Sequence, residues 1–331
     1  MADDISPRGP SRRAFLGSLG AGAAALAAPG VAAEPAAPAP ARSTVRDRLW
    51  IFTVHEGSNN NHLESGNVRG GSRMTPAEGA FYLGVPNLIM VREHDRPALP
   101  DGENWRAKTT FEQYATSFQP LDRVVWSVVG SGGKGGMGEL HHVLTLAKKF
   151  PNISGIYLDD FIIDRKNRDG RTVGRPALSP AELRSAREQM KAVGRPMEIW
   201  VTLYSHELLA QHPSHVGCDP PLADYLDLFD VLTLWTWNSD EIGTLEESLA
   251  GLEAIAPKGA RIALGLYIWD FQNRKPVPME LMERQCELGL KWLREKRIGE
   301  VIFLANTVLD VGLPGAEFAR QWIARAGRQP L

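Results

Sequence analysis

The chain has 331 residues, with 37 lysines and arginines against 39 aspartates and glutamates, which gives a formal net charge of −2. A weakly acidic chain without a basic run is not typical of a nucleic-acid-binding protein, so nucleic acid is not an expected partner. The length after the first 33 residues suits one large core of the size of a single α/β barrel. The two cysteines, Cys218 and Cys286, lack zinc-type spacing, and the sequence leaves open whether they form a disulfide.

The first 33 residues differ in composition from the rest of the chain. Ser11-Arg-Arg-Ala-Phe-Leu-Gly17 precedes a run of small apolar residues and Val31-Ala-Ala33, a pattern that resembles a twin-arginine export signal with its cleavage site. We therefore expect residues 1–33 to be a signal that engages the twin-arginine translocase, and the mature protein to be periplasmic or secreted. The apolar run is too short for stable membrane insertion. Residues 34–46, rich in alanine and proline, are expected to be a linker, and residues 47–331 the catalytic domain.

Strand and helix patterns alternate along the whole of this domain. Eight apolar runs predict strands at Leu49–His55, Asn87–Arg92, Arg123–Val129, Ile153–Asp159, Glu198–Tyr204, Val231–Trp237, Arg261–Trp269 and Val301–Asn306. Capping patterns at Thr75-Pro-Ala-Glu78 and Ser179-Pro-Ala-Glu182 predict two helix starts, and a short helix or loop is expected at 220–228. The alternation predicts a single-domain α/β fold, a (β/α)8 TIM barrel. A doubly wound open sheet is the alternative, although the first strand lacks a glycine-rich phosphate turn.

Four of these strands place aliphatic side chains on one face and aromatic or polar side chains on the other. In Ile153–Asp159, for example, Ile156 and Leu158 share a face, while Tyr157 and Asp159 share the opposite one. We expect the aliphatic face to pack on outer helices and the other face to line the barrel. Flat aromatic rings beside carboxylates are suited to a sugar, whose C–H faces stack while its hydroxyls donate hydrogen bonds.

In a barrel of this class, the site forms at the carboxyl ends of the strands. Polar and aromatic residues collect at these ends. The candidate substrate-binding residues are His55, Glu56, Glu93, Tyr157, Tyr204, His206, Trp235, Trp237, Asn238, Tyr267, Trp269 and Asn306. The glycine-rich loop at 130–136 lacks the Walker spacing, so it is interpreted as a flexible lid or a place where substrate approaches the backbone rather than as a nucleotide site.

The stretch Gly155-Ile-Tyr-Leu-Asp-Asp160, together with Trp235-Thr-Trp237 and Tyr267-Ile-Trp269-Asp270, resembles the (β/α)8 glycoside hydrolases. Several groups of that class carry a catalytic acid at the end of the fourth strand, and the resemblance implies this role for Asp159 or Asp160. The alternating acids of the chitinase-like pattern are absent, and so is the Asn-Glu pair of the largest retaining group. The resemblance therefore identifies no second carboxylate.

Glycoside hydrolysis needs two carboxyl groups across the scissile bond, one protonated and one ionised. Because neighbouring strand residues point to opposite faces, Asp159 and Asp160 are not expected to form this pair with each other. The candidate partners at other strand ends are Glu207, Asp270, Glu93 and Glu56. Glu207 and Asp270 are preferred because their strands also carry aromatic residues that face the barrel, although the alternation of its strand places Asp270 on the helix-facing side. No cofactor or metal is expected for this reaction.

Two alternatives remain open from the sequence. A metal-dependent sugar isomerase or epimerase on the same barrel would draw its ligands from Glu93, His94, Asp159, His206 and Glu207. A non-catalytic carbohydrate-binding protein would use the same aromatic rings and acids without turnover. In all three cases the expected partner is a carbohydrate.

Overall fold

The computed structural model describes residues 43–212 and 214–331, so the expected export signal and most of the expected linker lie outside the described residues. Eight parallel strands close into a barrel in the order β2, β1, β13, β10, β9, β8, β5 and β3, and pairing of β2 with β3 closes the ring. The strands are β1 (Leu49–Thr53), β2 (Asn87–Met90), β3 (Arg123–Gly130), β5 (Ile153–Leu158), β8 (Glu198–Tyr204), β9 (Val231–Trp235), β10 (Arg261–Tyr267) and β13 (Glu300–Leu304). The TIM barrel is confirmed, and the open-sheet alternative is wrong.

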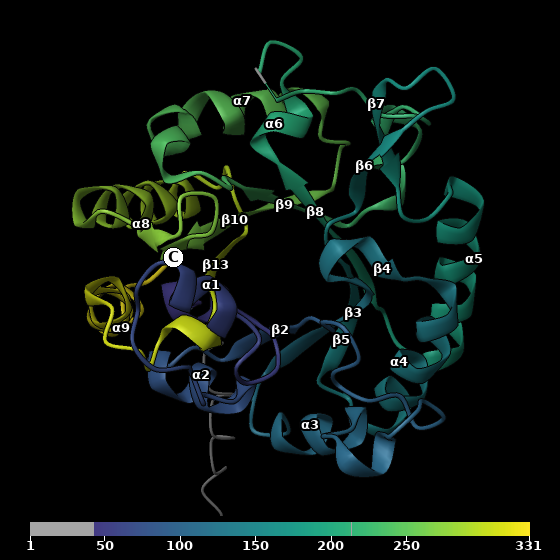
Figure 1. Ribbon diagram of the computed structural model, residues 1–331, viewed down its shortest axis with the longest axis horizontal. Helices are drawn as coiled ribbons and strands as arrows, with labels where there is room; N and C mark the ends of the chain where they lie inside the picture. The colour runs from purple at the N-terminus through teal and green to yellow at the C-terminus, as the bar shows by residue number, and fades with distance from the viewer. Residues whose placement is uncertain (1–42, 213) are drawn as a thin grey trace, which may run out of the picture. The chain divides into compact units, whose positions relative to one another are not determined.

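Helices surround the barrel, as Figure 1 shows in a view from the carboxyl ends of the strands. They are α2 (Pro76–Leu83), α3 (Phe111–Ser117), α4 (Met137–Lys149), α5 (Pro180–Met190), α7 (Leu245–Ile255), α8 (Met279–Arg294) and α9 (Pro314–Ala326). Two short helices, α1 (Asn60–Ser65) and α6 (Ser205–Leu208), follow β1 and β8 directly. At the fifth position two 3-10 turns, Leu222–Asp224 and Leu226–Leu228, take the place of an outer helix. Among the described residues, no helix combines the length and the apolar character needed to cross a membrane.

Local sequence signals explain where two of these helices begin. Thr75 and Ser179 accept hydrogen bonds from the N–H groups of Glu78 and Glu182, whose carboxylates in turn accept from the cap N–H groups at 2.8 and 2.7 Å. These reciprocal contacts satisfy backbone donors that the first turn leaves unpaired. Both predicted helix starts are therefore confirmed.

The segment after β5 has structure that the sequence patterns did not predict. Strands β6 (Ile162–Lys166) and β7 (Thr172–Pro176) form an antiparallel hairpin that projects from the carboxyl end of the barrel. Shorter strands add to the same end: β4 (Lys134–Gly135) pairs with β3, and β11 (Trp269–Asp270) pairs with β12 (Lys275–Pro276). Cys218 and Cys286 are both free thiols, so the disulfide that the sequence left open is not formed.

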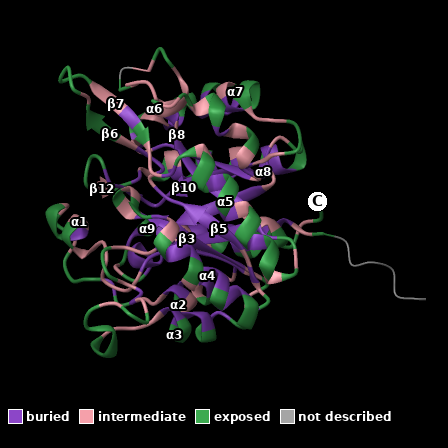
Figure 2. Cartoon of the chain, turned by 90° about the vertical axis from the view of Figure 1, so that its right-hand side faces the viewer, coloured by how far each residue is buried: buried purple, intermediate pink, exposed green. Residues whose placement is uncertain are grey.

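The buried residues are concentrated in the barrel strands, as Figure 2 shows. At the amino ends of the strands, Arg123, Glu198, Arg261 and Glu300 form a group that we call the floor cluster. Arg123 and Arg261 contact the Glu198 carboxylate at 2.6 and 3.1 Å, and Arg261 also contacts Glu300 at 3.0 Å. The rings of Trp50 and Trp200 lie beside this cluster, with centroids 4.7 Å apart. The floor of the barrel is therefore filled by paired charges and indoles.

Hydrogen-bonded side chains fill the middle of the barrel. The Tyr157 hydroxyl lies within hydrogen-bond distance of Thr202, Thr233 and the Trp235 indole N–H, at 2.8, 3.1 and 3.2 Å. These four residues come from β5, β8 and β9, and their shared position inside the barrel confirms the predicted alternation of faces in these strands. Gly265 on β10 leaves space for the Trp235 ring, since a Cβ at that position would lie 2.0 Å from the indole. This layer closes the barrel below its carboxyl end.

Candidate functional site

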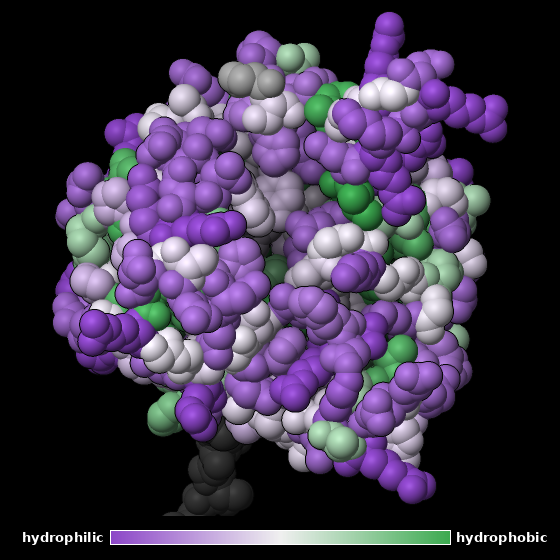
Figure 3. All heavy atoms as spheres, viewed as in Figure 1, coloured by the Kyte–Doolittle hydropathy of each residue, from purple (hydrophilic) through white to green (hydrophobic). Residues whose placement is uncertain are grey.

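Two adjoining cavities open at the carboxyl ends of the strands. The inner cavity, of about 210 Å³, is lined by Phe52, Val54, Asn59, His62, Glu93, Ser131, Asp159, Asp160, Tyr204, Trp235, Trp237, Tyr267, Phe271, Leu304 and Ala305. The outer cavity, of about 480 Å³, is lined by Gly132, Asp160, Ile162, Ile163, Asp164, Tyr204, His206, Glu207, His212, Ser214, Trp237, Asn238, Glu241 and Gln272. Because Asp160, Tyr204 and Trp237 line both, we call the two cavities together the cleft. Figure 3 shows this face hollowed near its centre and surrounded mainly by hydrophilic residues.

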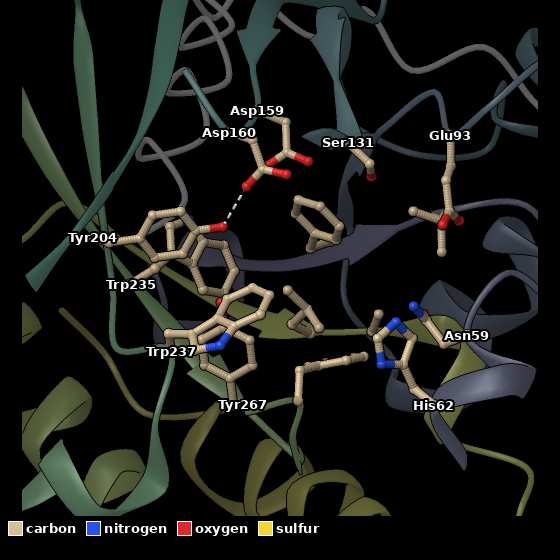
Figure 4. A pocket seen from close by; sticks show the side chains of 15 residues that line it. Asn59, His62, Glu93, Ser131, Asp159, Asp160, Tyr204, Trp235, Trp237 and Tyr267 are labelled. Carbon is tan, nitrogen blue, oxygen red and sulfur yellow. Dashed lines mark hydrogen bonds between the residues drawn. The ribbon is translucent and has the colours of Figure 1, made fainter. Parts of the chain in front are cut away.

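Asp159 and Asp160 both point into the inner cavity, as Figure 4 shows. The expectation that they diverge is wrong, because β5 ends at Leu158 and Asp160 has a left-handed backbone with φ of 41°. Non-glycine residues rarely adopt this conformation, which is enriched at functional sites. The strand's alternation thus stops one residue before the first aspartate, and the two carboxyl groups share a wall of the cavity.

The two aspartates have different surroundings. Asp160 accepts hydrogen bonds from the Tyr204 hydroxyl and from the Gly132 N–H, both at 2.6 Å, which are contacts that suit a carboxylate. Asp159 is only 5 % exposed, and the hydroxyl of Thr202 lies 3.2 Å from its Oδ1. Burial raises the pKa of Asp159 well above its usual range, and the neighbouring Asp160 charge raises it further. Asp159 therefore retains its proton to a higher pH than an ordinary aspartate does.

Glu93 also lines the inner cavity, beyond the end of β2, and in Figure 4 Ser131 lies between it and the two aspartates. Burial raises its pKa to about 7, partly offset by Lys134 and reinforced by the Asp160 charge. Its Oε2 is buried without a hydrogen-bond partner among the described residues, and its Oε1 lies 3.6 Å from Nδ1 of His94. A carboxyl group with a pKa near neutrality can give and take a proton at the working pH.

Aromatic rings line another side of the inner cavity. Tyr204, Trp235, Trp237 and Tyr267 gather there in Figure 4, and Tyr204 and Trp237 meet edge to face with centroids 5.7 Å apart. Trp235 is 1 % exposed, so it serves mainly as the closed bottom of the cavity, whereas Trp237 is half-buried and presents part of its ring to the cleft. The accessible stacking surface is therefore that of Trp237 rather than of all the predicted tryptophans.

Glu207 lies in the outer cavity with His206 and Asn238. Its carboxylate accepts a hydrogen bond from the Tyr204 N–H at 2.8 Å, which caps α6. Burial raises its pKa to about 8 despite this hydrogen bond, and the charges of Asp160 and Asp164 add to the shift. Of the two preferred partners for the aspartate doublet, Glu207 thus adjoins the inner cavity without lining it.

Asp270, the other preferred partner, lines neither cavity. It is 1 % exposed and accepts hydrogen bonds from the N–H and hydroxyl of Ser239 and from the N–H and side-chain amide of Asn273. Burial alone would raise its pKa, but these hydrogen bonds outweigh it and lower the pKa. The alternation of side chains along its strand predicted that Asp270 faces the helices, which agrees with this position. Its hydrogen bonds hold the loops after β9 and β10 together.

Five predicted substrate-binding residues also lie outside both cavities, each for a local reason. Tyr157 belongs to the hydrogen-bonded layer below the site. Trp269 is fully buried beside Gly66, because β10 ends at Tyr267 and its alternation does not continue. Asn306 is fully buried and bonds both N–H and C=O of Val54 at 3.0 Å. Glu56 accepts hydrogen bonds from Tyr114 and Arg96, at 2.6 and 3.3 Å. His55 is half-buried, and burial lowers its pKa to about 4.

The structure also adds lining residues that the sequence did not single out. Asn59, His62 and Ser131 come from loops after β1 and β3, and Phe271 follows β11. In the outer cavity, Asp164 comes from the unpredicted hairpin, while His212 and Glu241 come from the loops after β8 and β9. Their positions after barrel strands could have marked these residues as candidates. Polar residues are common in loops, however, so position alone did not distinguish them. Among the described residues, no group of three histidine, cysteine, aspartate or glutamate side chains is arranged to hold a metal ion, including the set considered for an isomerase.

Comparisons with known proteins identify no family. No family model matches the chain, and no curated protein matches its sequence. Solved structures with a similar fold include a putative chitinase A from Streptomyces coelicolor, with 11 % identity over 86 % of this chain and 98 % of that chain and a TM-score of 0.49. A putative α-L-fucosidase from Bacteroides thetaiotaomicron has 10 % identity over 85 % and 96 %, with a TM-score of 0.48. The similar structures are mostly glycoside hydrolases, but a 2,3-dimethylmalate lyase is also among them, at a TM-score of 0.41. At these identities the likeness concerns the barrel fold alone.

Proposed function

We propose that this chain is a glycoside hydrolase whose reaction takes place in the inner cavity. The observation that carries the proposal is the presence of three carboxyl groups around one small cavity, with Asp159 and Asp160 next to each other and Glu93 apart from them beyond Ser131. Their surroundings separate their protonation states, as acid and base catalysis on one glycosidic bond requires. Trp237 beside them offers a flat apolar surface for a sugar ring.

In this mechanism Glu93 is the general acid. It donates its proton to the glycosidic oxygen as the bond from that oxygen to the anomeric carbon breaks. Asp160 is the ionised partner, and it either attacks the anomeric carbon or takes a proton from the attacking water; the anomer of the first product, observed by NMR, distinguishes these two courses. Water supplies the hydroxyl group of the new reducing end and the proton that restores the acid. Protonated Asp159 positions Asp160 and limits the negative charge on their shared wall.

Release of reducing sugar from a panel of glycosides and polysaccharides tests the proposal, with chelator present and absent. Asp160→Asn is expected to reduce turnover about 10²–10⁴-fold, the range for loss of a general acid or base. Asp240→Asn is the matched control, because Asp240 is exposed and lines neither cavity. Release of reducing sugar that stops with chelator would contradict the metal-free mechanism, and no release under any condition would favour an isomerase, which metal analysis and isomerase assays test. Sugar binding without turnover by the unmodified chain supports the non-catalytic alternative.

We also propose that the protein is exported through the twin-arginine pathway to the periplasm or beyond. The support is the sequence of residues 1–33, which lie outside the described residues. Replacing both arginines, Arg12→Lys with Arg13→Lys, is expected to retain the full-length chain in the cytoplasm. Cell fractionation followed by immunoblotting makes the measurement, and unchanged export of the double variant would contradict the proposal.

A further inference from the structure

The charges that line the cleft all have the same sign. Six carboxyl side chains line it, and among the described residues no lysine or arginine does: the acids are Glu93, Asp159, Asp160, Asp164, Glu207 and Glu241. None of the six has a lysine or arginine nitrogen within 4.0 Å in the described part of the chain. The nearest basic influences are Lys134, which acts on Glu93 from a distance, and the histidines His94 and His212.

In the outer cavity, histidine contacts only one of the lining acids among the described residues. His212 lies 3.1 Å from Glu241, but burial lowers the pKa of His206, so its ring is neutral at neutral pH. Asp164 and Glu207 have no histidine within 4.0 Å among the described residues. An anionic sugar, such as a uronic acid or a sulfated sugar, would therefore find no lysine or arginine among the described lining residues, and the ionised acids would repel it.

One atom in the cleft also lacks a partner. Oε2 of Glu93 is buried, and no described residue donates a hydrogen bond to it. Buried acceptors are nearly always satisfied in native proteins, so one that faces a cavity indicates a donor supplied by a ligand. The lining acids therefore suit a ligand that donates hydrogen bonds and carries positive charge.

The shape of the outer cavity suits a sugar ring. Trp237 lies on the wall that it shares with the inner cavity, and its indole N–H donates to Gln272 at 2.8 Å, which fixes the orientation of the ring. A pyranose that stacks on this indole directs its equatorial substituents toward the surrounding side chains. On the other sides of the cavity those side chains are Asp164 of the hairpin, Glu207 of α6 and Glu241 of the loop after β9.

We propose that the outer cavity is a subsite for an amino sugar with a free, protonated amino group. Its ring stacks on Trp237, and its ammonium group is held by the carboxylates of Asp164 and Glu241, with Glu207 beside them. The inference rests on the proposed hydrolase function for the same cleft and names its substrate class as a glycan that carries unacetylated amines. Charge-assisted hydrogen bonds from the ammonium to these carboxylates replace the cations that the chain itself does not provide.

Binding of three matched oligosaccharides to the full-length chain tests the proposal by calorimetry near neutral pH. The three are β-1,4-linked tetramers of glucosamine, N-acetylglucosamine and glucose, which share ring and linkage and differ only at the second carbon. We expect the glucosamine tetramer to bind about tenfold or more tightly than either of the others, and added salt to weaken this binding alone. Equal affinities for the three, or no binding of the glucosamine tetramer, would overturn the proposal.

Variants locate the subsite. The double variant Asp164→Asn with Glu241→Gln is expected to lose about tenfold of the affinity for the glucosamine tetramer and to leave the N-acetylated and neutral tetramers unaffected. Asp169→Asn is the matched control, because Asp169 lies in the loop of the same hairpin whose strand β6 carries Asp164 but lines neither cavity. Loss of affinity in the control, or none in the double variant, would place the amine elsewhere and overturn the assignment.

The two proposals fail in different ways. Selective binding of the amine without hydrolysis of any glycan overturns the hydrolase function and leaves a binding site. Hydrolysis of neutral glycans at rates that do not depend on free amines overturns the amine subsite and leaves the hydrolase. The variant Asp160→Asn separates the two readouts, because it is expected to abolish turnover while retaining preference for the amine.

Discussion

The two ends of this barrel both bury carboxyl groups, but they treat the charge differently. At the floor, Glu198 and Glu300 each contact an arginine of the chain, and Glu198 also accepts a hydrogen bond from the Trp200 indole at 2.9 Å. At the cleft, six acids face a cavity with no lysine or arginine among the lining residues. A charge that the chain pairs internally stabilises the fold, whereas a charge left without a partner costs stability and is available for chemistry.

The pKa shifts follow this difference. Burial alone would raise the pKa of Glu198, but the arginines outweigh burial and lower it. Burial raises the pKa of Glu300 despite Arg261, since its other oxygen is buried without a partner. At the cleft, burial is again the largest cause of the pKa shifts. It raises the pKa of Glu93 to about 7 and that of Glu207 to about 8. The comparison therefore predicts opposite responses to substitution and to pH at the two ends.

The largest loss of stability is expected when the floor cluster loses Arg261, the cation that Glu198 and Glu300 share. Arg261→Met leaves Glu300 and part of Glu198 buried without their partner, and the free energy of unfolding is expected to fall by about 3–5 kcal/mol. The matched control is Arg297→Met, which also removes two ion pairs, with Glu246 and Glu253, but at the surface. This control is expected to lose about 1 kcal/mol or less. Denaturant unfolding measures both, and equal losses would remove the distinction between floor and surface.

The second prediction concerns pH and the cleft. Because the pKa of Glu93 is higher in the folded chain than in the unfolded chain, the folded state retains a proton that the unfolded state releases. Its contribution to stability is therefore lost progressively as pH rises from about 4.5 to about 7, by about 3 kcal/mol at most. Glu93→Gln should flatten the fall of unfolding free energy across this window. If the slope of the variant matched that of the unmodified chain, Glu93 would not be the buried acid that the structure indicates.

A pair of isosteric changes sharpens the comparison further. At neutral pH Glu198→Gln removes a charge that two arginines and an indole contact, so it should destabilise the chain by about 2 kcal/mol. Asp159→Asn replaces a group whose charged form is disfavoured by burial and by the neighbouring Asp160, so stability should stay the same or rise. Thermal or denaturant unfolding of the two variants gives the answer. Destabilisation by both substitutions would show that the charge of Asp159, like that of Glu198, stabilises the fold.

The barrel was predictable from sequence because its signals are local and repeated. Eight apolar runs, helix caps at Thr75 and Ser179, and alternation within strands such as β5 and β8 each report on a few neighbouring residues. The hairpin of β6 and β7 was missed because its sequence, from Asp164 to Arg171, is charged and lacks the apolar alternation of a half-buried strand. Its pairing is stabilised by the backbone and by contacts with the barrel, which no local pattern records.

The site was only partly predictable, because it depends on where each strand stops. Alternation carried past the end of β10 placed Trp269 in the barrel, and alternation carried past the end of β5 separated Asp159 from Asp160. Both inferences failed within two residues of a strand end, where backbone conformations such as that of Asp160 replace the extended one. Glu93 was a candidate partner but not a preferred one, since its raised pKa arises from burial by residues distant in sequence.

The smallest predicted effect concerns a single hydrogen bond at the cleft. The Tyr204 hydroxyl donates to Asp160 at 2.6 Å and is thus a positioning contact for the proposed ionised carboxylate. Tyr204→Phe should lower kcat about tenfold, the value of one hydrogen bond to a charged group, with a smaller change in KM because the ring remains. A change in KM alone would show that Tyr204 serves only as a wall of the cavity, and the stabilisation of charge at the cleft would then come from the Gly132 N–H and the bound sugar.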